Sequence, residues 1–262
     1  MTKKEYANQV AQIINGEVKE VEKTNGAKMT GILIDTGSNV RPCIYVDGMM
    51  EDGLTVEEAA ERVQEIAQKN AKSDLQIDDL MKWENVKPLL RARLYNQATN
   101  ADVSREAGHG FDDLVIIPYI EGIIENGSIK VTNAILNKWD VTADEVIDIA
   151  IKNSDKEADV KTMVETIKEM GFPVPAEMPD DGSMLVVTNK KKSFGAYAVI
   201  SKLPILKVLF PEGFTVLPSS VHEVIVTPIN DQEAFDDMVS TVNDEKVDYT
   251  EQLSNHSYRI AA

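Results

Sequence analysis

The dipeptide His222–Glu223 is the pair of side chains in this sequence most suited to proton transfer. We expect it to lie in a strand over residues 221–227, and both faces of that strand are apolar. Because successive side chains of a strand alternate between faces, one of the two residues must lie among hydrophobic neighbours or at the strand end. A buried imidazole or carboxylate needs a partner and has a shifted pKa, as catalytic groups do. A pair at the strand end, hydrogen-bonded to the preceding turn, explains the same residues without catalysis.

Two serines precede this histidine, and a serine beside a histidine is the arrangement of a nucleophile with its base. Ser220 is expected on the same strand face as His222, whereas Ser219 is expected on the other face. No G-x-S-x-G sequence surrounds either serine. The alternative is a Pro–Ser–Ser turn that caps the strand.

A second group of polar residues, His109, Asp112 and Asp113, offers nitrogen and oxygen ligands to a metal ion, with His222 or Glu223 as additional ligands from across the sheet. The sequence contains no H-E-x-x-H motif, no paired cysteines and no EF-hand loop. The two aspartates are also typical of a polar start to a buried strand. We therefore assign no metal and expect no cofactor.

The densest basic run comprises Lys190, Lys191 and Lys192, followed by Ser193. It precedes an expected helix, so its amides and lysines could hold a phosphate or carboxylate. The spacing of a P-loop is absent. A solvated turn is the alternative.

The chain is acidic, with a formal net charge of -17. This charge argues against broad contact with nucleic acid phosphates, which requires Lys and Arg, and against an anionic membrane surface. It is compatible with solubility, with a basic protein partner, or with imitation of nucleic acid. Two expected helices carry much of the charge. Their acidic residues, with those of the adjoining tail, are Glu57, Glu58, Glu61, Glu65, Asp231, Glu233, Asp236, Asp237, Asp244, Glu245 and Asp248.

Nothing in the sequence predicts a membrane span or an export signal. The N-terminal residues lack the apolar core of a signal peptide, and no apolar run approaches the roughly 18–20 residues that cross a bilayer. We therefore expect a cytoplasmic protein.

Residues 1–75 predict an N-terminal subdomain of helix, three-stranded meander and helix. Capping boxes begin the helices, with Thr2 and Glu5 at the first and Thr55 and Glu58 at the second. The three strands are expected over residues 17–23, 29–35 and 43–47, with Asn25–Gly26 as a hairpin turn.

Residues 76–262 predict a larger α+β domain. Residues 113–119 are apolar on both faces, which predicts a central strand with 129–131 as its neighbour, reached by a turn at 126–127. Residues 100–110 are expected to form a loop, and the proline-rich stretch 172–182 an internal connection. The further strands are expected at 89–95, 184–188, 214–217, 221–227 and 258–260. The helices are expected from Thr142 and at 158–170, 194–201, 204–210 and 232–242. The predicted fold class is α+β, a mostly antiparallel sheet with helices packed on it and two subdomains.

Six segments of the chain resemble the blocks of the DUF5688 family, and their order is loosely similar to the DUF1444 family. They are MTGILI, PCIYVDG, DLVIIPYI, NAILNKWDVTADEVIDIAIKNS, MLVVTNKKKSFGAYAVI and VLPSSVHEVIVTPI. The resemblance covers nearly the whole chain. It implies a bacterial protein with an accessory role, encoded near mobile elements, and carries no assigned activity.

Three functions remain open, and a non-enzymatic protein that binds a partner protein is the one we favour, because no motif with demanding spacing occurs. An acidic inhibitor that occupies the groove of a nucleic-acid enzyme is the second. A small hydrolase or metal-dependent enzyme that uses His222 and Glu223 is the third. Neither direct nucleic acid binding nor membrane association is expected.

Overall fold

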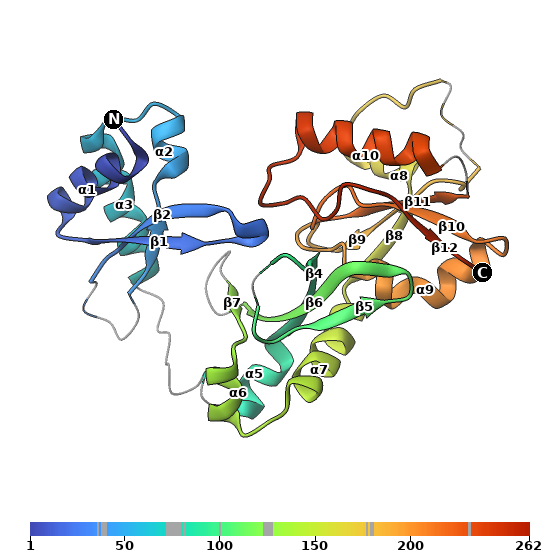
Figure 1. Ribbon diagram of the computed structural model, residues 1–262, viewed down its shortest axis with the longest axis horizontal. Helices are drawn as coiled ribbons and strands as arrows, with labels where there is room; N and C mark the ends of the chain where they lie inside the picture. The colour runs from blue at the N-terminus through green and yellow to red at the C-terminus, as the bar shows by residue number, and fades with distance from the viewer. Residues whose placement is uncertain are drawn as a thin grey trace.

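The computed structural model describes residues 1–35, 37, 41–71, 80, 82–99, 101–122, 128–176, 178, 181–229 and 232–262. These residues form helices and three sheets (Figure 1), in which every strand pair is antiparallel. The predicted α+β class is therefore confirmed. No helix in this described part of the chain is both long enough and apolar enough to cross a membrane.

The N-terminal elements are a three-stranded sheet with helices on one face, as predicted. They are α1 (Lys3–Ile14), β1 (Glu17–Glu22), β2 (Lys28–Leu33), β3 (Cys43–Tyr45), α2 (Asp47–Glu51) and α3 (Val56–Ala71), with a 3-10 turn η1 (Thr24–Gly26). Both predicted capping boxes are present, since the Thr2 and Thr55 hydroxyls accept from Glu5 and Glu58 and each glutamate side chain accepts in return. One face of the sheet packs on α1 and α3 through Ile32 and Ile44.

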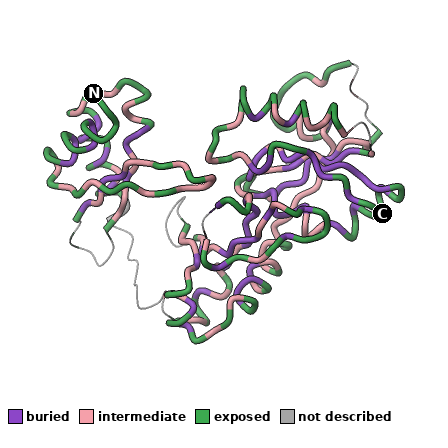
Figure 2. Tube along the Cα trace, viewed as in Figure 1, coloured by how far each residue is buried: buried purple, intermediate pink, exposed green. Residues whose placement is uncertain are grey.

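The N-terminal elements have a hydrophobic core of their own, which extends from Tyr6 to Ala67. A second, larger core extends from Val86 to Ile260. Figure 2 shows these as two separate groups of buried segments. The predicted boundary between residues 75 and 76 falls at 72–79, outside the described residues, and the division into two domains stays a prediction.

The second sheet is built around β6 (Phe111–Glu121), which pairs with β4 (Leu90–Asn96), β5 (Arg105–Gly108) and β7 (Ser128–Lys130). The predicted central strand and its neighbour are therefore confirmed; the predicted turn at 126–127 lies outside the described residues. The expected loop over 100–110 is wrong in part, because β5 lies within it. Gly108, His109 and Gly110 all have positive φ and form the tight turn that lets β5 return along β6.

The third sheet has the strand order β12-β10-β11-β9-β8. Its strands are β8 (Ala158–Thr162), β9 (Leu185–Asn189), β10 (Phe214–Leu217), β11 (Val224–Pro228) and β12 (Tyr258–Ile260). Helix α9 (Ala198–Leu209) packs on one face, and α8 (Met163–Glu169) and α10 (Gln232–Lys246) lie on the other (Figure 1). The remaining elements are α5 (Trp83–Val86), η2 (Lys87–Leu89), α6 (Asn133–Trp139) and α7 (Ala143–Asp155). The described part of residues 172–182, the predicted internal connection, contains neither helix nor strand.

Two helix predictions in this region are wrong. The expected helix over 158–170 is β8 followed by α8, because the hydroxyl of Thr162 caps a new helix whose first residue is Met163, while β8 pairs with β9. The two short helices expected at 194–201 and 204–210 are one helix, α9, with Pro204 inside. A proline in a helix removes one hydrogen bond, and burial of Leu203 and Leu206 offsets that loss.

The β1–β2 hairpin joins the two cores. Figure 1 shows it extending from the N-terminal elements toward the rest of the chain. At its tip, the Asn25 side-chain amide donates hydrogen bonds to the carbonyls of Tyr249 and Gln252, at 2.7 and 2.9 Å. These bonds hold the hairpin against the segment before β12.

Candidate functional site

His222 and Glu223 precede β11, so the prediction that they lie inside a strand is wrong. The ladder with β9 begins at Val224. The carbonyl of His222 instead accepts from the backbone N–H of Gly195 at 2.9 Å and from the Thr188 hydroxyl at 2.8 Å. The turn between β9 and α9 therefore occupies the backbone groups that a continued strand would need.

Both ring nitrogens of His222 have partners within the chain. Nδ1 accepts from the backbone N–H of Phe194 at 3.0 Å, and Nε2 lies 3.2 Å from Oε1 of Glu251. Because Nδ1 acts as an acceptor, the proton resides on Nε2 and points at Glu251. In this arrangement His222 orients Phe194 and Glu251, and neither nitrogen is available as a general base.

Phe194 has an unusual backbone conformation, with φ of 52°. A bulky residue with positive φ is an outlier, and such strain costs on the order of 1–3 kcal/mol and is concentrated at functional sites. The next residue must be glycine, because a Cβ at Gly195 would lie 2.5 Å from both Asn189 N and Thr188 Oγ1. The tight turn thus directs the Phe194 ring toward β4 and β6.

The Phe194 ring contacts Arg93, a buried arginine of β4. The guanidinium carbon of Arg93 lies 3.6 Å from the Phe194 ring centroid and 4.2 Å from that of Tyr119. Its Nε and Nη2 donate to Oε1 of Glu121 at 3.0 and 2.8 Å. Burial raises the pKa of Tyr119, and the neighbouring Tyr95 raises it further. Arg93 is therefore a desolvated cation between two rings, with a carboxylate partner.

These residues form one wall of a cleft of about 570 Å³, here called the Arg93 cleft. The β1–β2 hairpin and β3 form the opposite wall. The residues that line it are Val21, Glu22, Lys23, Thr24, Met29, Tyr45, Arg93, Tyr95, Thr99, Tyr119, Ser128, Lys130, Phe194, Thr250 and Glu251. The cleft thus lies where elements of the two hydrophobic cores meet, a common position for binding sites.

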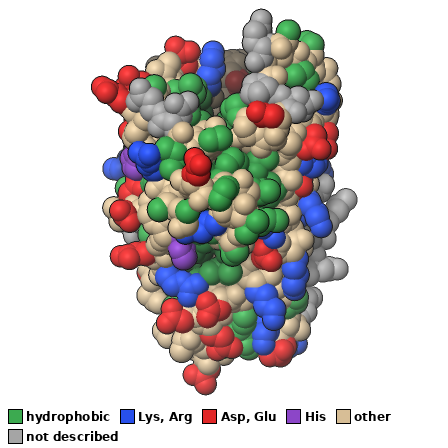
Figure 3. Space-filling model, turned by 90° about the vertical axis from the view of Figure 1, so that its right-hand side faces the viewer, with side chains coloured by type: hydrophobic (Ala, Val, Ile, Leu, Met, Phe, Trp, Pro, Cys, Tyr) green, Lys and Arg blue, Asp and Glu red, His purple; other side chains and the backbone are tan. Residues whose placement is uncertain are grey.

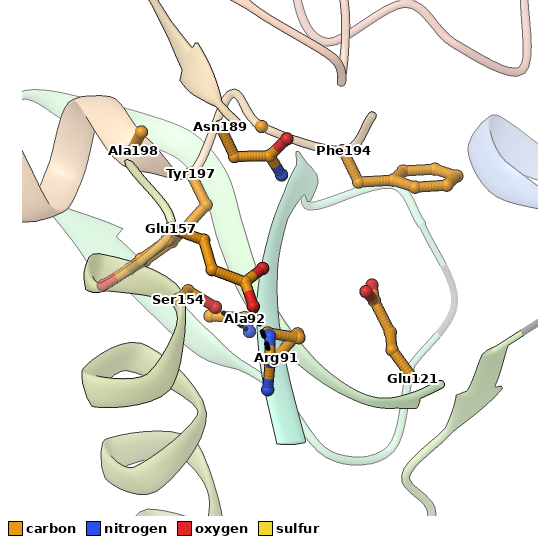
Figure 4. Close-up of a pocket in the computed structure, with 10 residues that line it drawn as sticks. Arg91, Ala92, Glu121, Ser154, Glu157, Asn189, Phe194, Tyr197 and Ala198 are labelled. Carbon is orange, nitrogen blue, oxygen red and sulfur yellow. Dashed lines mark hydrogen bonds and ion pairs between the residues drawn. The ribbon is translucent and has the colours of Figure 1, made fainter. Parts of the chain in front are cut away.

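The basic turn, Lys190 to Ser193, borders this region. Nζ of Lys191 lies 3.5 Å from Glu121 and 3.9 Å from Glu157, and Nζ of Lys192 lies 3.5 Å from Glu169. Beside the turn, Nη2 of Arg91 bonds to Oε1 of Glu157 at 2.6 Å (Figure 4). Two of the predicted anion-binding lysines thus face carboxylates of the chain itself.

Glu223 projects into a different hollow, here called the Glu223 groove. The groove has a volume of about 420 Å³ and lies between α8 and the face of the third sheet opposite α9. Apolar side chains of Met163, Met170, Val186 and Ile225 contribute to its lining. Among the described residues, the Glu223 carboxylate has no hydrogen-bond or ion-pair partner.

The serines before His222 form a turn. The backbone N–H of His222 donates to the Ser220 hydroxyl at 3.0 Å, and the backbone N–H of Ser220 donates to the carbonyl of Glu223 at 3.2 Å. Ser219 lines the Glu223 groove. These are the bonds of the capping turn considered as the alternative to a nucleophile.

The structure separates His109 from Asp113. His109 is exposed in the β5–β6 turn, and Asp112 is exposed at the start of β6. Asp113 accepts from the Tyr258 hydroxyl at 2.5 Å and lies 3.3 Å from Nε2 of His256. In the described ranges no three His, Cys, Asp or Glu residues are grouped so that they could hold a metal ion.

Sequence reasoning did not single out Arg93, Phe194, Glu251, His256 or Tyr258. A signal for Arg93 was present, since Arg91 and Arg93 are spaced by two in an otherwise apolar strand and so share one face with Tyr95. Phe194 follows the basic turn, but its φ cannot be read from its residue type. Glu251 and His256 lie outside strands, so no periodicity could place them.

Comparison with known proteins gives one match. No curated protein and no solved structure matches the chain. The model of the DUF5688 family, described as a family of unknown function, matches residues 2–260. The chain therefore belongs to the DUF5688 family.

Proposed function

We propose that this protein acts without catalysis, by binding a partner protein in the Glu223 groove. The observation that carries the proposal is an open apolar groove with a carboxylate that has no partner among the described residues. An unpaired carboxylate beside apolar surface is favourable only if solvent or a partner satisfies it. A protein segment that fills the groove would supply both apolar side chains and a cation.

The apolar character of this region extends to its rim. Met170 is 60% exposed at the end of α8, and the nearby Phe172 is 61% exposed. Contiguous exposed apolar surface marks interaction sites, and methionine side chains adapt to the shape of an incoming side chain. The groove is therefore suited to the apolar face of a helix or an extended segment.

The charges of the groove and of the whole chain favour a basic partner. Two lysines and three carboxylates line the groove. Lys161 pairs with Asp159 and Glu169, and Lys192 also pairs with Glu169. Neither lysine forms an ion pair with the third carboxylate of the groove, that of Glu223. The net charge of -17 would speed the approach of a basic protein. We place this encounter in the cytoplasm and expect the partner to be encoded near the same mobile element.

The other two functions receive less support. An enzyme based on His222 would need a ring nitrogen that is free to take a proton, and both nitrogens have partners within the chain. A mimic of nucleic acid would need one continuous acidic face. The acidic helices α3 and α10 instead lie in separate parts of the molecule, α3 among the N-terminal elements and α10 over the third sheet (Figure 1). On the face in Figure 3, acidic and basic side chains are interspersed around apolar ones.

Affinity purification from the source organism tests the proposal, with the full chain as bait. We expect a basic partner in stoichiometric amount with wild type, and its loss with Glu223→Lys and with Met170→Glu. Val208→Glu is the matched control, because Val208 is exposed on α9, on the opposite side of the third sheet. Recovery of the bait alone, or a partner that all three variants retain, would contradict the proposal.

A further inference from the structure

The Arg93 cleft presents four aromatic rings that come from four separate segments. Tyr45 lies in β3, Tyr95 in β4 and Tyr119 in β6, and Phe194 lies in the turn before α9. Ring faces bind flat groups by stacking. The volume of about 570 Å³ lies within the range of small-molecule sites, roughly 300–1,000 Å³.

Three hydrogen-bond donors of the same lining have no acceptor among the described residues. Nζ of Lys23 lies 4.1 Å from the Tyr45 ring centroid and has no carboxylate partner. Arg93 donates hydrogen bonds to Glu121 through Nε and Nη2, so its third nitrogen, Nη1, has no acceptor among the described residues. The hydroxyl of Thr99, a residue only 7% exposed, also has no partner. Buried polar groups are nearly always paired, so the unsatisfied hydroxyl of Thr99 indicates a missing acceptor, whereas the half-buried ammonium of Lys23 is open to solvent or to a ligand.

We propose that the Arg93 cleft binds a small planar anion, a molecule with a flat ring and a carboxylate or phosphate group. The rings hold the flat part, and Lys23 and Arg93 bind the anionic oxygens. The Arg93 cleft and the Glu223 groove share no lining residue, and the inference is independent of the function proposed for that groove.

The overall negative charge does not prevent such binding. Three cations, Lys23, Arg93 and Lys130, and two carboxylates, Glu22 and Glu251, line the cleft. At physiological salt the Debye length is about 8 Å, so charges outside the cleft are largely screened. Of the two carboxylates, that of Glu251 faces Nε2 of His222, at 3.2 Å, and so repels an anion in the cleft less than a free carboxylate would.

Isothermal titration calorimetry on the full chain tests the inference with four probes. Adenosine 5′-monophosphate and indole-3-acetate each combine a ring with an anion, whereas adenosine provides the ring alone and inorganic phosphate the anion alone. We expect at least one ring-bearing anion to bind with Kd below about 1 mM, and adenosine and phosphate to bind at least about tenfold more weakly. The preferred probe distinguishes a phosphate from a carboxylate. The inference is overturned if neither ring-bearing anion binds more tightly than ring or anion alone.

Two substitutions locate the binding. Lys23→Gln and Phe194→Leu should each weaken binding of the preferred probe by about tenfold or more, since each removes one class of contact. Lys28→Gln is the matched control, because Lys28 belongs to the same hairpin, is exposed and does not line the cleft. If Phe194→Leu fails to fold, Lys23→Gln decides alone, and unchanged affinity in that variant would assign the binding elsewhere and overturn the inference.

Discussion

The backbone N–H of Phe194 donates a hydrogen bond to Nδ1 of His222 at 3.0 Å, and this bond joins the basic turn to the segment before β11. It fixes the proton of His222 on Nε2, which faces Glu251. It also holds Phe194 in a left-handed conformation, with its ring under the guanidinium of Arg93. One histidine thus organises a wall of the Arg93 cleft without contacting its interior.

Replacement of His222 should lower stability through this bond. His222→Ala leaves the Phe194 N–H without its acceptor, and we expect a loss of about 1–3 kcal/mol in the free energy of unfolding. His222→Asn should recover part of the loss, because an amide oxygen can accept the same hydrogen bond. Urea unfolding measures both variants. His109→Asn, in an exposed turn, is the control and should match wild type; a His222→Ala variant as stable as wild type would show that the bond contributes nothing.

Gly195 should tolerate no larger residue. A Cβ there would meet Asn189 N and Thr188 Oγ1 at 2.5 Å and the His222 carbonyl oxygen at 2.8 Å. We expect Gly195→Ala to cost about 1–3 kcal/mol, because backbone would have to move. Gly48→Ala is the matched control, since nothing lies within 4 Å of its Cβ position and alanine favours helix. Thermal unfolding compares the two, and equal stability would contradict the predicted clash.

The elements that the sequence predicted correctly are those with local signals. Thr2 with Glu5 and Thr55 with Glu58 cap the first and second long helices as their spacing indicates. The apolar run at 113–119 lies in the central strand β6. Capping and burial depend on residues that are close in sequence, so a single chain is enough to reveal them.

The candidate sites depend on contacts that are distant in sequence. His222 has a strand-like neighbourhood, but its carbonyl bonds to Gly195 and Thr188, which takes it out of the ladder. Ala158–Thr162 has helical periodicity, yet pairing with β9 determines its structure. Tertiary hydrogen bonds overrode local preference in both places, and no single-sequence pattern reports them.

The ion pair between Arg93 and Glu121 should contribute strongly, because both side chains are largely buried, at 7% and 18% exposed. Among the described residues, Arg93→Met leaves the Glu121 carboxylate with Lys191, at 3.5 Å, as its remaining cation, so we expect a loss of about 3–5 kcal/mol. The double variant Arg93→Met/Glu121→Met removes both charges and should lose less than the two single variants together, with a coupling of about 1 kcal/mol or more. Urea unfolding of wild type, Arg93→Met, Glu121→Met and the double variant measures this double-mutant cycle. Additive losses would mean that the pair is not energetically coupled.

Asp236 should make stability depend on pH in the acid range. Burial alone would raise the pKa of Asp236, but hydrogen bonds from Ser257 and Gln232 and the charge of His256 outweigh it, so the folded pKa lies below the unfolded value. Oδ1 of Asp236 accepts from the backbone N–H and the hydroxyl of Ser257, each at 2.7 Å. A lowered folded pKa contributes stability that is present above the unfolded pKa and is lost as pH falls through the folded pKa.

We therefore expect Asp236→Asn to be less stable than wild type by about 1–2 kcal/mol at neutral pH. The difference should shrink as pH falls below about 4, the ordinary range of an unfolded aspartate, because the unfolded chain then binds a proton that the folded carboxylate resists. Urea unfolding at a series of pH values measures this, with Asp237→Asn as the control from an exposed position of the same helix. A difference that stayed constant down to about pH 3 would mean that the carboxylate charge of Asp236 does not hold Ser257 and the start of β12 against α10.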